Sequence, residues 1–129
     1  MYCLDSNIII ESFRGNPEVK SRLNNIKDYE ICITPLILCE LYRGAFLSKN
    51  TDKNLIIIKE LLKKLTILDF DTYSCELYGR IYLQLKSIGK QTQDADLMTA
   101  AICISNNKTL ITRNKKHYQN IPSLILEIW

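Results

Sequence analysis

The sequence contains only one histidine, His117, and none of its five cysteines belongs to a C-x-x-C pair. A structural zinc site is therefore not expected, because such sites assemble four Cys or His ligands at short, regular spacings. The cysteines are odd in number and lie mostly among apolar residues, so we expect buried free thiols in a reducing cytosol. They are Cys3, Cys32, Cys39, Cys75 and Cys103.

The sequence also lacks a long hydrophobic run, and no basic segment precedes an apolar one after Met1. We therefore expect no membrane span, no export signal and a cytoplasmic location. No repeat, linker or low-complexity tract divides the 129 residues, which predicts a single domain over residues 1–129. The net charge of +3 is compatible with a nucleic-acid partner but does not require one.

Short segments typical of strands alternate with longer segments typical of helices. Strands are expected at 2–5, 30–33, 66–70, 109–112 and 124–126, and helices at 6–13, 17–26, 35–47, 55–65, 72–88 and 94–104; residues 113–119 are a basic loop or short helix. This alternation predicts an α/β fold with a parallel sheet covered on both faces. A ligand site should lie at the carboxyl ends of the strands, where Asp5 stands.

The segment from Gln93 to Ile104 has two acids at its start and is then apolar almost all round. It predicts a buried helix with Asp94 as N-cap and Asp96 in the first turn. The positive end of the helix dipole favours the ionised form of both acids. The alternative is that they serve only as cap and dipole partners.

Glu40 is expected on a helix face that includes Ile37 and Gly44, where its carboxylate would be partly buried. A buried charge needs a cation, a hydrogen-bond network or a metal ion. A structural ion pair with Arg43 or another basic residue is the alternative.

Asp5, Glu40 and Asp94 or Asp96 could converge on one edge of the sheet. Each has a simpler alternative, which for Asp5 is capping the helix that follows. Like charges that lie close together repel strongly unless a cation neutralises them, and oxygen ligands suit Mg²⁺ and Mn²⁺. Such a site could support metal-assisted hydrolysis of a phosphodiester.

Four motifs in register carry a family resemblance: LDSNI at 4–8, CELYRGA at 39–45, DADLMTAA at 94–101 and LITRN at 110–114. Together they resemble the PIN-domain ribonucleases, most closely the VapC toxins of prokaryotic toxin–antitoxin pairs. The similarity covers essentially the whole chain, down to Ile128-Trp129.

The resemblance implies a PIN-like α/β/α sandwich with a central, mainly parallel sheet of four to five strands. It also implies a Mg²⁺- or Mn²⁺-dependent endoribonuclease that acts on tRNA or another translation RNA and is inhibited by a VapB-type antitoxin. It assigns catalytic and metal-binding roles to Asp5, Glu40 and Asp96. Asp94 is then a helix cap or an auxiliary ligand.

Other positions follow from the same comparison. Asn7, Thr112 and Asn114 are expected to orient water, and because Asn114 replaces a fourth acid, one tightly held ion is expected. Thr99 stands where an aliphatic residue is usual. His117 lies where an acid before an aromatic residue is common, and we interpret it as a surface histidine rather than a catalytic acid or base.

Arg113, Lys115 and Lys116 lie just past the acidic edge and could bind RNA phosphates, although a solvated turn is the alternative. Apolar residues in the helices at 17–26 and 55–65, together with the resemblance, predict a homodimer. A non-catalytic module that binds antitoxin or RNA, and a PIN nuclease of RNA processing or DNA, are the competing functions.

Overall fold

The centre of the molecule is a parallel five-stranded sheet with the strand order β3-β2-β1-β4-β5. The computed structural model describes residues 1–129. The strands are β1 (Tyr2–Leu4), β2 (Ile31–Ile33), β3 (Thr66–Ile67), β4 (Thr109–Thr112) and β5 (Leu126–Ile128). β1 lies between β2 and β4, with Cys3 opposite Cys32 on one side and Leu110 on the other. The predicted α/β fold with a parallel sheet is confirmed.

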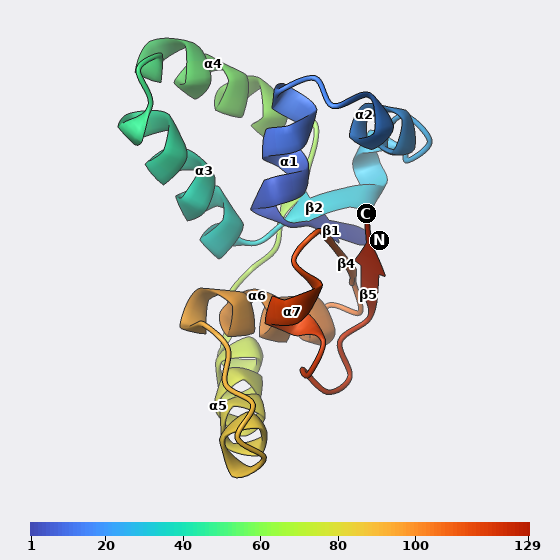
Figure 1. Cartoon of the computed structure of the whole chain (residues 1–129), viewed down its shortest axis with the longest axis vertical. Helices are drawn as coiled ribbons and strands as arrows, with labels where there is room; N and C mark the ends of the chain where they lie inside the picture. The colour runs from blue at the N-terminus through green and yellow to red at the C-terminus, as the bar shows by residue number, and fades with distance from the viewer.

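Helices cover both faces of this sheet. They are α1 (Ser6–Phe13), α2 (Pro17–Leu23), α3 (Pro35–Leu47), α4 (Thr51–Leu62), α5 (Thr72–Ser87), α6 (Asp94–Ser105) and α7 (Lys115–Tyr118), with a 3₁₀ turn at Asp28–Glu30. In Figure 1, α1 and α2 lie above the sheet and α6 and α7 below it, while α3 and α4 form a projecting hairpin. α5 packs along α6.

Helix starts follow the capping residues of the sequence. Thr34 accepts a hydrogen bond from the amide of Ile37, with Pro35 at the first helical position of α3. Asp71 accepts in the same way from the amide of Ser74 at the start of α5. The first of these caps fixes the start of the helix that carries Glu40.

α6 is the most deeply buried helix. Its residues from Thr99 to Cys103 are at most 2% exposed, because the helix packs between the sheet and α5. The hydroxyl of Thr99 lies 3.2 Å from that of Thr34, and both are buried. This bond explains why a polar residue is tolerated in an apolar helix, and it ties the start of α3 to α6.

Several predicted boundaries are wrong. The third strand is only Thr66–Ile67, because it lies at the sheet edge with a single neighbour, and the last strand runs over Leu126–Ile128 rather than 124–126. α4 begins four residues before the predicted start, and α2 ends at Leu23.

Cys39 and Cys75 are exposed rather than buried, while the other three cysteines are buried, and all five are free. None of the helices has the length and apolar character needed to cross a bilayer.

Candidate active site

Asp5 lies at the carboxyl end of β1 and is only 4% exposed. Its Oδ2 accepts a 2.6 Å hydrogen bond from the hydroxyl of Thr112, at the end of the neighbouring strand β4, and a 3.1 Å bond from Asn7 Nδ2. Its Oδ1 accepts from the amide of Ser6, so the predicted capping of α1 is present as well. These donors hold the carboxylate in one orientation.

Burial raises the pKa of Asp5 above its usual value, and the charge of Asp96 raises it further. The hydrogen bonds from Thr112 and Ser6 act in the opposite direction, because they favour the ionised form. The net rise shows that the protein donors do not fully replace the water lost by this carboxylate. A bound cation would supply the missing stabilisation.

Asp96, in the first turn of α6, has a side chain that is 13% exposed. Its Oδ1 accepts a 3.1 Å hydrogen bond from the hydroxyl of Tyr118, on α7. Its Oδ2 is buried and has no hydrogen-bond partner. Burial raises the pKa of Asp96, the Tyr118 bond and the His117 ring lower it, and the charge of Glu40 raises it.

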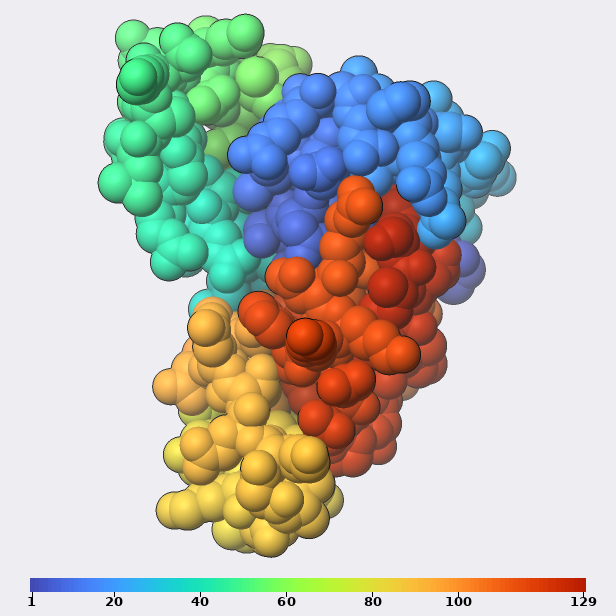
Figure 2. All heavy atoms as spheres, in the orientation of Figure 1, coloured from blue at the N-terminus to red at the C-terminus, as the bar shows by residue number.

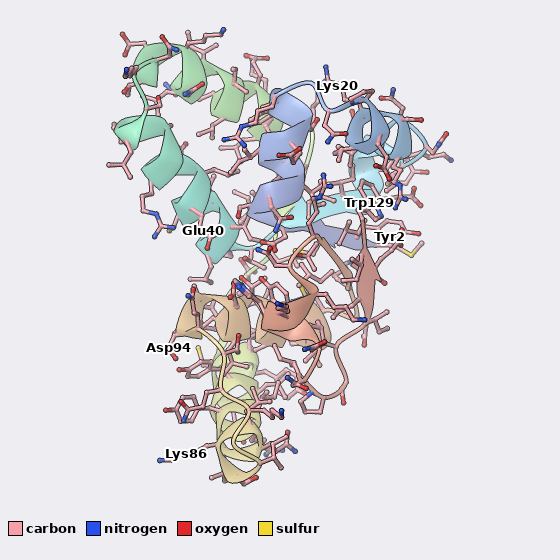
Figure 3. The ribbon with its side chains drawn as sticks, viewed as in Figure 1. Tyr2, Lys20, Glu40, Lys86, Asp94 and Trp129 are labelled. Atoms are coloured by element: carbon pink, nitrogen blue, oxygen red, sulfur yellow. The ribbon has the colours of Figure 1, made fainter.

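Glu40 lies half-buried near the start of α3, which contacts α6 (Figure 3). It lines a groove of about 380 Å³ together with residues of α1 and α4, and it takes part in no ion pair. The structural ion pair with Arg43 is therefore absent. The charge of Glu40 raises the pKa values of both Asp96 and Tyr118, so the acid belongs to the same electrostatic neighbourhood.

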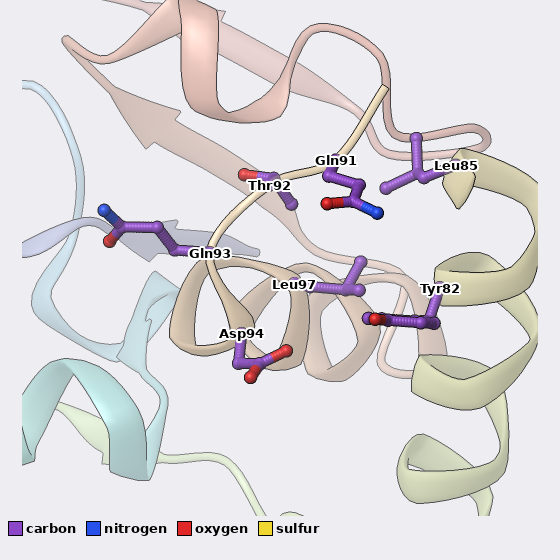
Figure 4. Close-up of a pocket in the computed structure, with 7 residues that line it drawn as sticks. All are labelled: Tyr82, Leu85, Gln91, Thr92, Gln93, Asp94 and Leu97. Carbon is purple, nitrogen blue, oxygen red and sulfur yellow. The ribbon is translucent and has the colours of Figure 1, made fainter. Parts of the chain in front are cut away.

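Asp94 does not cap α6, contrary to prediction. Gln93 occupies the N-cap position without a side-chain bond, because Asp94 already has helical geometry. The Asp94 side chain is exposed and accepts a 2.7 Å hydrogen bond from the hydroxyl of Tyr78 on α5, which raises the pKa of that tyrosine to about 12. Figure 4 shows Asp94 at a pocket of about 250 Å³ with Tyr82. Its role as a metal ligand stays a prediction.

A hydrogen-bond network around Asp5 includes the three residues that were predicted to orient water, Asn7, Thr112 and Asn114. Asn7 Nδ2 also lies 3.3 Å from the Thr112 hydroxyl, and Asn7 Oδ1 accepts from the amide of Arg113. The amide of Asn114 donates to the Thr112 hydroxyl, and its own side chain is exposed. Asn7 and Thr112 therefore position the Asp5 carboxylate, and the water-orienting roles remain predictions.

The three predicted RNA-binding residues lie beside this network. A guanidinium nitrogen of Arg113 lies 3.6 Å from a carboxylate oxygen of Glu11, so part of the arginine charge is already neutralised. Lys115 and Lys116 are exposed on α7, without ion pairs, on the same short helix as His117. These two lysines carry unpaired positive charge on the helix whose Tyr118 binds Asp96.

A divalent ion fits the donor set as an open site rather than as a closed cage. No three His, Cys, Asp or Glu side chains converge closely enough to enclose an ion. Mg²⁺ commonly uses only one or two carboxylates and keeps several waters, so such a cage is not needed. The buried, unmatched Oδ2 of Asp96 and the raised pKa values of Asp5 and Asp96 are what a cation would relieve. Figure 2 shows the surface indented between α3 and the start of α6.

Sequence reasoning missed two neighbours of Asp96. Tyr118 is 1% exposed and binds Asp96, and His117 Nδ1 lies 3.0 Å from Asp96 Oδ2 instead of pointing into solvent away from the site. Both contacts depend on α7 folding back onto α6, which no local pattern at 113–119 predicts. The available signals were the family resemblance at His117 and an aromatic residue in an otherwise polar segment.

Comparison with known proteins identifies the family of this chain. The PIN domain family model matches residues 2–121. Ribonuclease VapC2 of Rickettsia felis is 34% identical, over 100% of this chain and 98% of the relative. The tRNA(fMet)-specific endonuclease VapC of Salmonella typhimurium is 28% identical, over 99% and 97%.

A solved structure extends the similarity to three dimensions. The crystal structure of VapBC2 from Rickettsia felis, bound to a DNA fragment from its promoter, matches with a TM-score of 0.89 at 31% identity. The match covers 99% of this chain and 98% of the other. This chain therefore belongs to the PIN-domain family and, within it, to the VapC ribonucleases.

Proposed function

We propose that this protein is the toxin of a VapBC-type toxin–antitoxin pair and acts as a Mg²⁺- or Mn²⁺-dependent endoribonuclease. The observation that carries the proposal is a pair of acids, the buried Asp5 and the largely buried Asp96, whose pKa values are raised and one of which has an unmatched buried oxygen. Structural acids are usually hydrogen-bonded or ion-paired, so a cation-binding role accounts for this arrangement.

Asp5, Asp96 and Glu40 would hold the ion, and Asp94, whose exposed carboxylate binds Tyr78, would not. When bound, the ion supplies positive charge to the phosphate and promotes ionisation of a water molecule. Thr112 and Asn7 keep the Asp5 carboxylate oriented through bonds of 2.6 and 3.1 Å. Tyr118 does the same for Asp96 at 3.1 Å. These supporting bonds matter because small displacements of reacting groups cost large factors in rate.

The proposed substrate is tRNA or another translation RNA, supported by the tRNA specificity in the name of the Salmonella typhimurium relative. Lys115, Lys116 and Arg113 would contact backbone phosphates next to the acids, since phosphate contacts position a strand without reading its sequence. Cleavage of translation RNA implies a cytoplasmic location. This location is part of the proposal.

The proposed partner is a VapB-type antitoxin, because the matching Rickettsia felis structure is of VapBC2. A homodimer is also proposed. Ile56 on α4 is 62% exposed, as that prediction requires, whereas the apolar residues of the 17–26 segment pack against the chain's own core. Light scattering at micromolar concentration should give the mass of a dimer, and a monomer mass would remove this part of the proposal.

The test of function is incubation of antitoxin-free protein with total tRNA in Mg²⁺ or Mn²⁺, with EDTA as the control. Discrete fragments that disappear in EDTA support the proposal. A folded protein that binds Mn²⁺ but cleaves no RNA would favour the non-catalytic binding module, and cleavage of DNA in preference to RNA would favour the DNA-directed nuclease.

A further inference from the structure

His117 faces Asp96 across the contact between α7 and α6. Its Nδ1 lies 3.0 Å from Asp96 Oδ2, a distance that would allow a hydrogen bond. The ring is not aligned to donate one, because Oδ2 remains without a hydrogen-bond partner. The carboxylate oxygen and the ring nitrogen, both atoms of types that bind metal ions, thus lie close together without a hydrogen bond.

The spacing of these two atoms matches a pair of metal ligands. Donors at neighbouring corners of an octahedron, each about 2.1 Å from the metal, are about 3.0 Å apart. The Asp96 oxygen is buried, while the imidazole ring of His117 is part of a side chain that is 45% exposed. An ion at this point would therefore have room for water or a phosphate oxygen on its outer side.

Both ligands sit on fixed backbone. Asp96 belongs to the buried helix α6. The carbonyl of His117 accepts a 2.8 Å hydrogen bond from the hydroxyl of Thr92, in the connector before α6, and its amide donates to the carbonyl of Asn114. The neighbouring Tyr118 is 1% exposed and anchors α7. The pair is therefore preorganised rather than a chance approach of two mobile side chains.

We propose that His117 is a nitrogen ligand of the metal site and makes that site prefer a first-row transition ion such as Mn²⁺ over Mg²⁺. The inference rests on the proposed metal-dependent function. An imidazole nitrogen suits transition ions, whereas Mg²⁺ prefers an all-oxygen octahedron, so a mixed oxygen and nitrogen set penalises Mg²⁺ selectively.

The experiment uses the fact that the chain has a single histidine. Pulsed electron paramagnetic resonance of tag-free protein loaded with Mn²⁺ should show coupling to an imidazole nitrogen, which can come only from His117. The coupling should be absent in His117→Gln. Bound Mn²⁺ without imidazole coupling in the wild type would overturn the inference and leave the proposed nuclease intact. No bound Mn²⁺ at all would contradict the metal site of the proposed function itself.

Calorimetric titration gives a second readout. The ratio of the dissociation constants for Mg²⁺ and Mn²⁺ should fall roughly tenfold or more in His117→Gln, mainly because Mn²⁺ binds more weakly. Lys116→Gln is the matched control on the same helix: it removes a nearby positive charge, changes both affinities alike and leaves the ratio unchanged. An unchanged ratio in folded His117→Gln, checked by circular dichroism, would contradict the inference.

Discussion

Replacing Asp96 with asparagine should stabilise the protein in the absence of metal and abolish its stabilisation by Mn²⁺. The carboxylate is buried, its pKa is raised, and its Oδ2 has no hydrogen-bond partner. In Asp96→Asn the amide oxygen can still accept from the hydroxyl of Tyr118. The substitution therefore removes the unpaired charge and keeps the existing hydrogen bond.

The expected gain follows from the cost of a buried group without a partner, about 1–3 kcal/mol, which is larger when the group is charged. Allowing for incomplete burial of the site, we expect a gain of roughly 1–2 kcal/mol in the free energy of unfolding. At about 4 °C per kcal/mol for a domain of this size, Tm should rise by roughly 4–8 °C.

The stability gain of Asp96→Asn over the wild type should increase as the pH rises. A carboxyl group whose pKa is raised on folding binds more protons in the folded state between its unfolded value, about 3.9, and the raised value. Wild-type stability therefore falls as pH rises through that window, and Asp96→Asn lacks this contribution. The advantage of the variant should be full near neutral pH and should shrink towards about pH 4.

Urea denaturation in EDTA, and then in Mn²⁺, measures both effects. Mn²⁺ at a hundredfold excess over its dissociation constant should stabilise the wild type by about 2.7 kcal/mol and leave Asp96→Asn unchanged, which reverses their order. Asp94→Asn is the matched control two residues away, because its carboxylate is exposed and bound to Tyr78. Asp96→Asn that is less stable than the wild type in EDTA, or equally stabilised by Mn²⁺, would refute the reasoning.

Two further predictions concern a hydrogen bond to the Asp5 carboxylate and a proposed contact with RNA. Thr112→Val removes the 2.6 Å donor to the buried carboxylate at the end of β1 and should lower the free energy of unfolding by about 2 kcal/mol, whereas Thr112→Ser keeps the hydroxyl and most of the stability. Urea denaturation of both variants checks this, and equal losses would count against the hydrogen bond. Lys116→Ala should weaken RNA binding by a similar factor for different RNA sequences and reduce the slope of log affinity against log salt by about one. Lys86→Ala, at the far end of α5 in Figure 3, should change neither, and an equal effect there would argue against a local contact.

Much of the fold could be predicted because the starts of several helices are set by residues next to them in the sequence. Thr34-Pro35 and Asp71 start helices through side-chain caps that depend only on the next few residues. The edge strand β3 was predicted too long because its limits depend on pairing with β2, which is set by the tertiary structure.

The candidate site was partly predictable for a related reason. Asp5 and Thr112 come together because parallel strands end at the same edge of the sheet, a rule that needs no side-chain detail. The cap of α6 was assigned to Asp94 because a carboxylate is the better capping residue, yet the helix begins at Asp94 and the carboxylate binds Tyr78 instead. The pairing of His117 with Asp96 spans 21 positions of sequence and depends on how α7 packs, so only the structure reveals it.

The most direct test of the central claim is the single-turnover rate of tRNA cleavage in Mn²⁺, compared between the wild type, Asp96→Asn and Asp94→Asn. The account predicts a loss on the order of a thousandfold for Asp96→Asn, since a metal ion contributes several kcal/mol of transition-state stabilisation, and a rate close to the wild type for Asp94→Asn. Cleavage by folded Asp96→Asn at the wild-type rate would contradict it.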